Sequence, residues 1–446
     1  MNKTTLWSIV VAVAGFLFGF DTVVISGANE PTLALWNLSP INHGLFIMSM
    51  ALWGTVIGAI FGGIPADKFG RKKSLFWIGV LFLVSALGSA IAQDPYSFSF
   101  FRFIGGVGVG ASSVVAPMYI AEISSAKNRG KLVALYQFFL VFGILIAYFS
   151  NALLDGFYGA NDWRWMLGVE AIPAFIYCVL ILKVPNSPRW LTLKKKDDVA
   201  AIEVLNIIYD KEEAAIHLKE IKEESLSEKN NSTSVFKKKY SLPLILAFLI
   251  AFFNQLSGIN FLLYYAPTIF ERAGIADPMW ASVAIGASNL IFTMVGLSLI
   301  DKLGRKQLII IGSIGYIVSL LVASWAFKTE ASASIIMTSM IVFVASHAIG
   351  SGAVIWVFIS EIFPNHVRAM GNSFGCSVHW VLAALITLLT PVFLDKENGY
   401  FGDNPWPIFA FFAGMMVLQL LFAIFIMPET NGISLEDLKK KLIKDK

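Results

Sequence analysis

The feature that most constrains the fold of this chain is a series of twelve runs of about twenty mostly apolar residues, arranged as six plus six. The first six lie near residues 6–28, 44–66, 74–92, 97–120, 131–154 and 164–185, and the second six near 242–266, 280–300, 307–327, 334–358, 371–394 and 406–427. Such a run crosses a bilayer as a helix, because in hydrocarbon each backbone N–H and C=O group must be hydrogen-bonded within its own segment. The sequence therefore predicts an all-α membrane protein with twelve transmembrane helices.

The composition excludes a soluble alternative. Hydrophobic residues make up 57% of the chain and charged residues only 14%, whereas soluble domains carry about 25% charged residues. Cys178 and Cys376 form no disulfide framework, and the histidines form no H-x-x-x-H pair. The glycine run at 105–110 follows no predicted strand, so it indicates close helix packing and not a dinucleotide site. We expect no cofactor, no metal ion and no nucleic-acid partner.

A charged segment separates the two sets of runs. Residues 187–240 contain several lysine and glutamate clusters, while 199–208 keeps the apolar spacing of a helix, which predicts short amphipathic helices joined by polar linkers. We therefore expect an N-terminal six-helix bundle over 1–186, a helical linker over 187–240, and a C-terminal bundle with a short tail over 241–446.

The basic residues indicate how the chain is oriented. With twelve spans, 29 of the 34 Lys and Arg residues fall on the side that holds both termini and the linker. The exceptions are Arg102, Arg164, Arg272, Lys328 and Lys396. The positive-inside rule places that basic side in the cytoplasm. The formal net charge of +4 is therefore a topology signal and not a binding patch.

The two halves repeat short motifs at corresponding places. The string Asp-Lys-x-Gly-Arg-Lys occurs at 67–72 after the second run and at 301–306 after the eighth. Glu122 and Glu361 follow the fourth and tenth runs, and the halves end in Pro-Asn-Ser-Pro-Arg-Trp and Pro-Glu-Thr. This pattern is typical of a duplicated six-helix unit.

Over essentially its whole length the chain resembles a sugar porter of the major facilitator superfamily. The resemblance rests on the repeated motif, on Pro-x-Ser-Pro-Arg-Trp, on Gln-Leu-Ser-Gly-Ile-Asn at 255–260, on the Pro-Glu-Thr ending and on the central helical loop. It implies two pseudo-symmetric six-helix bundles with a cytoplasmic helical loop. It also implies that cytoplasmic motif residues pair between helices and hold the outward-facing state closed on that side.

The residues to which this gating role is carried over are Asp67, Arg71, Glu122, Arg129, Arg189, Asp301, Arg305, Glu361 and Arg368. The alternative is that they are ordinary topology anchors. One departure bears on the gate: Asn186 stands where members of the family usually carry Glu. A charge pair is then missing, and we expect a weaker latch in the N-terminal half.

Three charged residues lie inside the predicted spans, where such groups are costly and so are functional candidates. Asp21 in the first run and Arg102 in the fourth would each be prohibitive alone in hydrocarbon, which favours their mutual pairing. A permanent structural salt bridge is the alternative. Proton-coupled bacterial sugar porters carry Asp and Arg in these motifs, so the resemblance implies proton coupling. Glu170 in the sixth run either assists proton passage or makes a structural pair.

Sugar recognition needs amides and hydroxyls that donate and accept hydrogen bonds, with aromatic faces for the apolar side of the ring. Amides, aromatics and one imidazole occur on the fifth, seventh, eighth, tenth and eleventh runs, at Gln137, Gln255, Asn260, Tyr264, Asn289, Trp356, His379 and Trp380. Gly258 permits a local helix break beside Gln255. The resemblance implies sugar contacts at most of these positions, and adds Phe18, which shares a helix face with Asp21.

Three departures limit this transfer. Asn254 replaces the first Gln of the usual pair, and Ile144 replaces a Gln found in the bacterial xylose symporter. His379 stands where Asn or Gln is common, and His347 adds a second imidazole in the tenth run. A His in each of these two spans also occurs in the mammalian fructose facilitator, which points toward fructose without establishing it.

The sequence thus predicts a proton-coupled monosaccharide symporter of the cell (inner) membrane, with both termini cytoplasmic. It would work by alternating access, binding the sugar near the midplane between the bundles. The expected partners are a sugar of the glucose, fructose, xylose or galactose class, protons and the lipid bilayer, and the expected functional form is a monomer. The alternatives are a passive uniporter of the same fold and a transporter-like sugar sensor. A membrane enzyme is not expected, since no nucleophile–base pair or metal cluster is evident.

Overall fold

The computed structural model describes residues 3–125, 127–228, 234–402 and 404–433, together with 438, 442 and 443. All regular secondary structure in these residues is helical, as the sequence predicted. Residues 229–233 of the predicted linker and most of the predicted tail beyond 433 lie outside the described residues.

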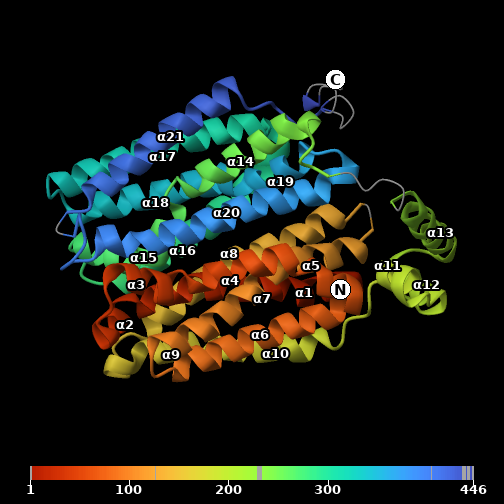
Figure 1. Ribbon diagram of the computed structural model, residues 1–446, viewed down its shortest axis with the longest axis horizontal. Coiled ribbons are helices and arrows are strands. Elements are labelled where there is room, and N and C mark those ends of the chain that lie inside the picture. The colour runs from red at the N-terminus through yellow and green to blue at the C-terminus, as the bar shows by residue number, and fades with distance from the viewer. Residues whose placement is uncertain are drawn as a thin grey trace. The chain divides into compact units, whose positions relative to one another are not determined.

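The contacts divide the chain into two compact units, which Figure 1 shows by helix label. Unit 1 comprises the described residues within 1–22, 50–147 and 164–232, and unit 2 those within 23–49, 148–163 and 233–446. Unit 2 therefore includes two short segments that come from the first half of the sequence. The predicted boundaries at 186 and 240 remain a proposal about the sequence repeat.

Unit 1 is built mainly from the first half of the chain. Its helices are α4 (Met50–Phe61), α5 (Gly63–Phe69), α6 (Arg71–Ile91), α7 (Pro95–Glu122), α10 (Ala171–Ile181), α11 (Pro188–Trp190), the π-helical turn η4 (Leu191–Lys195), α12 (Asp198–Ile208) and α13 (Lys211–Glu228). Three further helices begin in one unit and end in the other: α1 (Lys3–Val24), α8 (Arg129–Leu154) and α9 (Asp162–Gly168).

Unit 2 contains the second six-helix set. Its membrane-length helices are α14 (Ser241–Gln255), α15 (Ile259–Arg272), α16 (Pro278–Leu303), α17 (Arg305–Lys328), α18 (Ala333–Ile349), α19 (Ser351–Glu361), α20 (Asn365–Leu394) and α21 (Trp406–Phe425), where α14 with α15 and α18 with α19 each form one interrupted span. Its short segments are η1 (Ile25–Ala28), α2 (Asn29–Trp36), α3 (Pro40–His43), η2 (Gly44–Met48), η3 (Gly159–Asn161) and η5 (Lys238–Tyr240).

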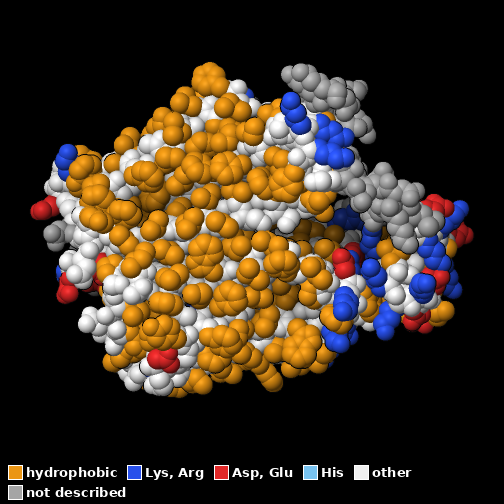
Figure 2. Space-filling view, viewed as in Figure 1, with side chains coloured by type: hydrophobic (Ala, Val, Ile, Leu, Met, Phe, Trp, Pro, Cys, Tyr) orange, Lys and Arg blue, Asp and Glu red, His pale blue; other side chains and the backbone are white. Residues whose placement is uncertain are grey.

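The predicted six-plus-six pattern of spans is confirmed. Within the described ranges, eleven helical stretches are long and apolar enough to cross a bilayer. A twelfth is the bent pair Pro40–Met48 and Met50–Phe61, whose axes meet at 44°, and it coincides with the second predicted run. On unit 1, Figure 2 shows hydrophobic side chains over the sides of the long helices, while Lys and Arg gather around α11, α12 and α13.

Close packing between α4 and α7 explains the glycine run of α7. A Cβ atom on Gly106 would lie 1.8 Å from the Ala51 carbonyl oxygen, and one on Gly110 would lie 2.2 Å from the Thr55 oxygen. Any side chain at these positions would push the two helices apart. The run therefore lies inside a helix and serves packing, as predicted.

The linker forms the short amphipathic helices that its pattern predicted. Trp190, Leu191, Ala201 and Val204 make a small buried cluster shared by α11, η4 and α12. The Trp190 indole also donates a hydrogen bond to the Asp67 carbonyl oxygen at 3.1 Å. This bond joins the start of the linker to the last turn of α5.

Candidate functional site

The charged residues of the first and fourth spans meet inside unit 1. The Arg102 Nη1 atom lies 2.5 Å from Asp21 Oδ1, and Nη2 donates to the Asp21 carbonyl oxygen at 3.0 Å. The Glu170 carboxyl interacts with both Asp21 and Arg102. All three residues are about 1% exposed. The predicted Asp21–Arg102 pair is therefore present, and Glu170 joins it.

Local backbone features place these side chains together. Glu170 lies in a turn between α9 and α10, which interrupts the sixth span at the level of the charged group. Gly105 lets α7 approach, since a Cβ atom there would be 2.3 Å from Ser85 Oγ and 3.4 Å from Asp21 Oδ1. Sequence reasoning named all three charged residues but did not predict this break.

The charged group has more hydrogen-bonding capacity than its members use. In the described part of the chain, Asp21 Oδ2, Glu170 Oε1 and Arg102 Nε have no hydrogen-bond partner. Buried polar atoms are nearly always satisfied, so each such atom in a native structure requires an explanation. Two carboxylates next to one buried guanidinium would leave an excess negative charge, and one proton bound to a carboxyl oxygen neutralises it.

The first copy of the repeated motif forms an ion-pair group in unit 1. The Arg71 guanidinium lies 3.0 Å from Asp67 one turn away and 3.0 Å from Glu122 at the end of α7. Ser187, just before α11, donates its hydroxyl to the other oxygen of Glu122. The group thus connects α5, α6, α7 and the start of the linker.

The second copy has the same construction in unit 2. Arg305 pairs with Asp301 at 3.1 Å and with Glu361 at 2.8 Å, and the Thr430 hydroxyl donates to Glu361 at 2.6 Å. One feature is added: Glu429 accepts backbone N–H bonds from Arg305 and Lys306 at the start of α17, both at 3.0 Å. No such bond to Asn186, its counterpart by sequence, occurs among the described residues of unit 1.

The three remaining arginines of the predicted gate differ in their surroundings. The charge of Arg189 interacts with that of Glu122, and the charge of Arg368 with that of Glu361. Arg129 is exposed at the start of α8, and within the described residues it makes no ion pair. Its positive charge instead opposes the effect of burial, which raises the pKa of Tyr209 in the linker. The gating role of Arg129 therefore stays a prediction.

Three of the predicted sugar ligands, Gln255, Asn260 and His379, lie together in unit 2. The helix break predicted at Gly258 is present: α14 ends at Gln255, Gly258 has φ 86°, and α15 begins at Ile259. Asn260 donates to the Gln255 Oε1 atom at 2.8 Å, and Gln255 Nε2 lies 2.9 Å from His379 Nε2. Gln255, Asn260 and His379 thus form one buried polar group.

Aromatic rings border this polar group. The Trp356 and His379 ring centroids are 4.9 Å apart, and those of His379 and Trp380 are 4.8 Å apart. Trp356 is 36% exposed, so its indole is not fully covered by the surrounding side chains. Tyr264 is buried on α15, and Asn289 on α16 accepts a weak bond from Thr293 at 3.4 Å. Of the predicted ligands, the structure brings Gln255, Asn260, His379, Trp356 and Trp380 into a chain of mutual contacts.

The other predicted ligands are placed separately. Phe18 is buried on α1 and Gln137 is half-buried on α8, both in unit 1. His347 contacts neither Gln255 nor His379 by any hydrogen bond in the described residues; its Nδ1 atom lies 2.5 Å from the Tyr316 hydroxyl. The two histidines noted in the sequence therefore have different partners.

Sequence reasoning missed a polar group at the other end of the spans. In unit 2, Asn29 donates to Thr268 Oγ1 at 3.0 Å and its Oδ1 atom lies 2.9 Å from His43 Nε2. Thr268 in turn donates to Glu30 at 2.8 Å. These residues, the outer polar group, join α2 and α3 of the first half to α15 of the second. They line a cavity of about 340 Å³ that also includes Arg272 and Asp395.

Sequence reasoning also assigned no role to Ser187, Thr430 and Glu429. The sequence contained a signal for them. When the bundle endings Pro-Asn-Ser and Pro-Glu-Thr are aligned, Ser187 corresponds to Thr430 and Asn186 corresponds to Glu429. No comparable repeat connects the members of the outer polar group. Among the described residues, no group of three or more His, Cys, Asp or Glu side chains is placed to hold a metal ion.

Known proteins resemble this chain over nearly its full length. The profile of the family described as "Sugar (and other) transporter" matches residues 7–442. The arabinose-proton symporter of Bacillus subtilis (strain 168) is 36% identical, with 100% of this chain and 96% of that protein covered. The glucose transporter GlcP of Staphylococcus epidermidis is 34% identical, with 99% and 97% covered.

A solved structure has the same fold. The xylose transporter XylE from E. coli, in a partially occluded inward open conformation, superposes with a TM-score of 0.85 at 32% identity. The match covers 97% of this chain and 99% of that one. An identity above 30% over the whole length indicates shared ancestry as well as a shared arrangement of helices.

Proposed function

The chain belongs to the sugar (and other) transporter family, and from this premise we propose that it is a proton-coupled monosaccharide symporter working by alternating access. It is an integral protein of the inner membrane with the major facilitator fold. The observation that carries the proposal is the buried group of Asp21, Arg102 and Glu170 in unit 1. A passive sugar carrier has no need of two carboxyl groups and a guanidinium in its hydrocarbon core, where each is costly.

The charge balance of this group gives proton coupling a physical basis. One guanidinium neutralises one carboxylate, so the second buried carboxyl is stable when it carries a proton. The short ion pair between Asp21 and Arg102 holds the resting arrangement. A proton delivered to Asp21 abolishes that attraction and frees Arg102. Helices α1 and α7 can then separate, and we propose that this step allows the conformational change that moves the sugar.

For the substrate we propose a pentose or hexose. Related proteins carry the names of arabinose, xylose and glucose transporters. The polar group of Gln255, Asn260 and His379 offers donors and acceptors to sugar hydroxyls, and Trp356 offers an aromatic face. Phe18, Gln137, Tyr264, Asn289 and Trp380 remain candidate ligands.

We also propose that both termini are cytoplasmic, which the distribution of Lys and Arg supports. The Arg71 and Arg305 ion-pair groups then lie on the cytoplasmic side. The outer polar group, at the opposite ends of the spans, lies on the external side. Under alternating access, bonds such as Asn29 to Thr268 have to break whenever the external side opens.

The test is sugar-driven proton movement in proteoliposomes. Purified protein is reconstituted with an internal pH-sensitive dye, and xylose, arabinose, glucose, galactose and fructose are added in turn. The expected result is acidification of the vesicle interior with at least one sugar, because protons enter together with the sugar, and loss of this acidification in Asp21→Asn. The matched control is Asp94→Asn, because Asp94 is an exposed residue that caps the start of α7.

A facilitated uniporter would give a different pattern. Vesicles with the unaltered protein and vesicles with Asp21→Asn would both exchange labelled sugar, and the internal pH would change in neither. That result, or sugar accumulation that survives in Asp21→Asn, contradicts the proposed coupling. If no sugar of the panel is exchanged at all, the proposed substrate class is wrong.

A further inference from the structure

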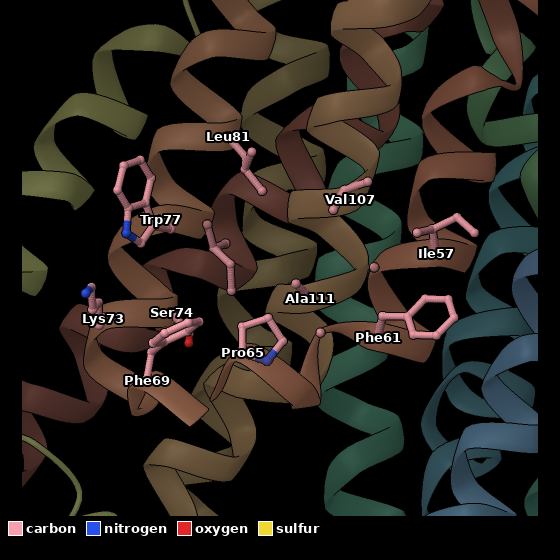
Figure 3. A pocket seen from close by; sticks show the side chains of 13 residues that line it. Ile57, Phe61, Pro65, Phe69, Lys73, Ser74, Trp77, Leu81, Val107 and Ala111 are labelled. Carbon is pink, nitrogen blue, oxygen red and sulfur yellow. The ribbon is translucent and has the colours of Figure 1, made fainter. Parts of the chain in front are cut away.

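An apolar groove opens on unit 1, and its lining includes none of Asp21, Arg102 and Glu170. Its walls come from α4, α5, α6 and α7, and its volume is about 390 Å³, within the range of about 300–1,000 Å³ typical of small-molecule sites. Figure 3 shows Phe61 and Ile57 at one edge and Phe69, Lys73 and Trp77 at the other. Nearly all of its lining is hydrophobic.

The groove follows from the small residues along its floor. A Cβ atom on Gly58 would lie 2.2 Å from the Val107 carbonyl oxygen, and one on Gly62 would lie 2.9 Å from the Ala111 side chain. These contacts bring α4 against α7 while leaving no side chain to fill the space above them. The large edge residues stay exposed: Phe61 is 52% and Trp77 is 55% exposed. A stable groove of this kind in a membrane-spanning unit faces acyl chains.

The groove has a basic rim at one end. The Lys68 and Lys73 ammonium groups lie 5.3 Å and 5.5 Å from the Phe69 ring centroid, one on α5 and the other on α6. Neither makes an ion pair in the described part of the chain, because Asp67, the adjacent acid, is taken by Arg71. Two unneutralised ammonium groups beside an apolar groove match a lipid whose headgroup is negatively charged.

We propose that this groove binds one anionic phospholipid of the phosphatidylglycerol type. An acyl chain occupies the space between Phe61 and Trp77, and the headgroup phosphate contacts Lys68 and Lys73. Trp77 lies on the groove near the rim, where indole rings favour the boundary between headgroups and hydrocarbon. The site is separate from the proposed sugar and proton sites and does not depend on them.

Native mass spectrometry of the detergent-purified chain tests this proposal. The protein is titrated with phosphatidylglycerol, phosphatidylcholine or phosphatidylethanolamine of equal chain length, with no sugar and no pH gradient. We expect one phosphatidylglycerol to bind more tightly than either zwitterionic lipid. A lysine close to an anionic lipid contributes about fivefold in affinity, so Lys68→Gln/Lys73→Gln should lose roughly 25-fold for phosphatidylglycerol alone.

Two further variants separate the groove from general charge. Lys183→Gln removes an exposed lysine of unit 1 outside the groove and should leave binding unchanged. Leu81→Trp places a large ring in the groove and should weaken phosphatidylglycerol binding although both lysines remain. Equal retention of the three lipids by the unaltered protein overturns the proposal. So does an unchanged affinity in the double lysine variant, or a loss in Lys183→Gln as large as in that variant.

Discussion

The ion pair between Asp21 and Arg102 is buried deeply enough for its removal to be measured as stability. Consider Arg102→Gln, which deletes the guanidinium but keeps a shorter, neutral polar side chain. Arg102 makes a 2.5 Å ion pair with the Asp21 side chain and a 3.0 Å bond to its carbonyl oxygen, and both residues are about 1% exposed. The variant therefore leaves Asp21 and Glu170 in the membrane core without their cation.

The expected cost of this single change is about 3–5 kcal/mol of unfolding free energy, the range found when one partner of a buried ion pair is removed. Asp21→Asn should cost a similar amount, since it leaves the guanidinium without its carboxylate. The double variant Asp21→Asn/Arg102→Gln replaces both charges by neutral amides that can hydrogen-bond to each other. Such neutral replacements of a buried pair are often close to neutral in stability, so we expect the double variant to be more stable than either single variant.

The assay is reversible unfolding in mixed detergent micelles, followed by far-ultraviolet circular dichroism, for the four proteins of this cycle. The sum of the two single losses should exceed the loss of the double variant by more than about 2 kcal/mol, well outside the 0.5 kcal/mol scatter of independent sites. Arg129→Gln is the control, because Arg129 is exposed and its loss should cost no more than about 0.5 kcal/mol. Additive losses in the cycle would refute the assignment of Asp21 and Arg102 as a mutually stabilising pair.

Three further outcomes follow from the polar groups of the two units. Glu429→Gln should lower the free energy of unfolding by about 1–2 kcal/mol, and Asn186→Glu should raise it by up to about 1 kcal/mol, because a carboxylate at a helix start accepts hydrogen bonds from the free N–H groups. Thermal unfolding of both variants measures these changes. A change of the same sign and size in the two variants would contradict the prediction. His379→Leu removes the imidazole beside Gln255 and should raise the KM for sugar about tenfold, the effect of one lost hydrogen bond of about 1.4 kcal/mol; an unchanged KM would exclude His379 from sugar recognition. Asn29→Ala should loosen the outer polar group and shift the population of the externally open state by about three- to tenfold, measured as spin-label distances between the ends of α2 and α15. No shift is expected for Lys328→Gln, because Lys328 is exposed and does not line the cavity of this group.

The spans and the two ion-pair groups could be predicted because each leaves a local or repeated signal. An apolar run long enough to cross the bilayer nearly always forms a transmembrane helix. Even the bent second span therefore lies where its apolar run predicted. The same sequence motif occurs at the Arg71 group and at the equivalent place of the Arg305 group. A motif that recurs at equivalent places of two halves is rarely a chance match. Asp21 and Arg102 could be identified as functional candidates because charged residues within apolar runs are rare.

The outer polar group had no such signal. Asn29 and Thr268 are 239 positions apart, and both lie near the ends of apolar runs, where polar residues are ordinary. His43 was one of five scattered histidines. Only folding brings the three together. The contact between Gln255 and His379 is similar: both residues were predicted to face a sugar, but pairing across 124 positions depends on how α14 and α20 are rotated about their axes, which periodicity alone does not determine.

The two ion-pair groups differ in the number of interactions that hold them closed. In each, an arginine binds an aspartate four positions earlier and a glutamate at the end of another helix, and a hydroxyl residue orients that glutamate. Among the described residues, only the second copy adds a carboxylate, that of Glu429, which accepts hydrogen bonds from the start of α17. The first copy has Asn186 at the matching position, so α6 begins without an anionic cap. Helix α6 should therefore separate from its neighbours at a smaller free-energy cost than α17, and in an alternating-access cycle the first ion-pair group is the one that we expect to open first.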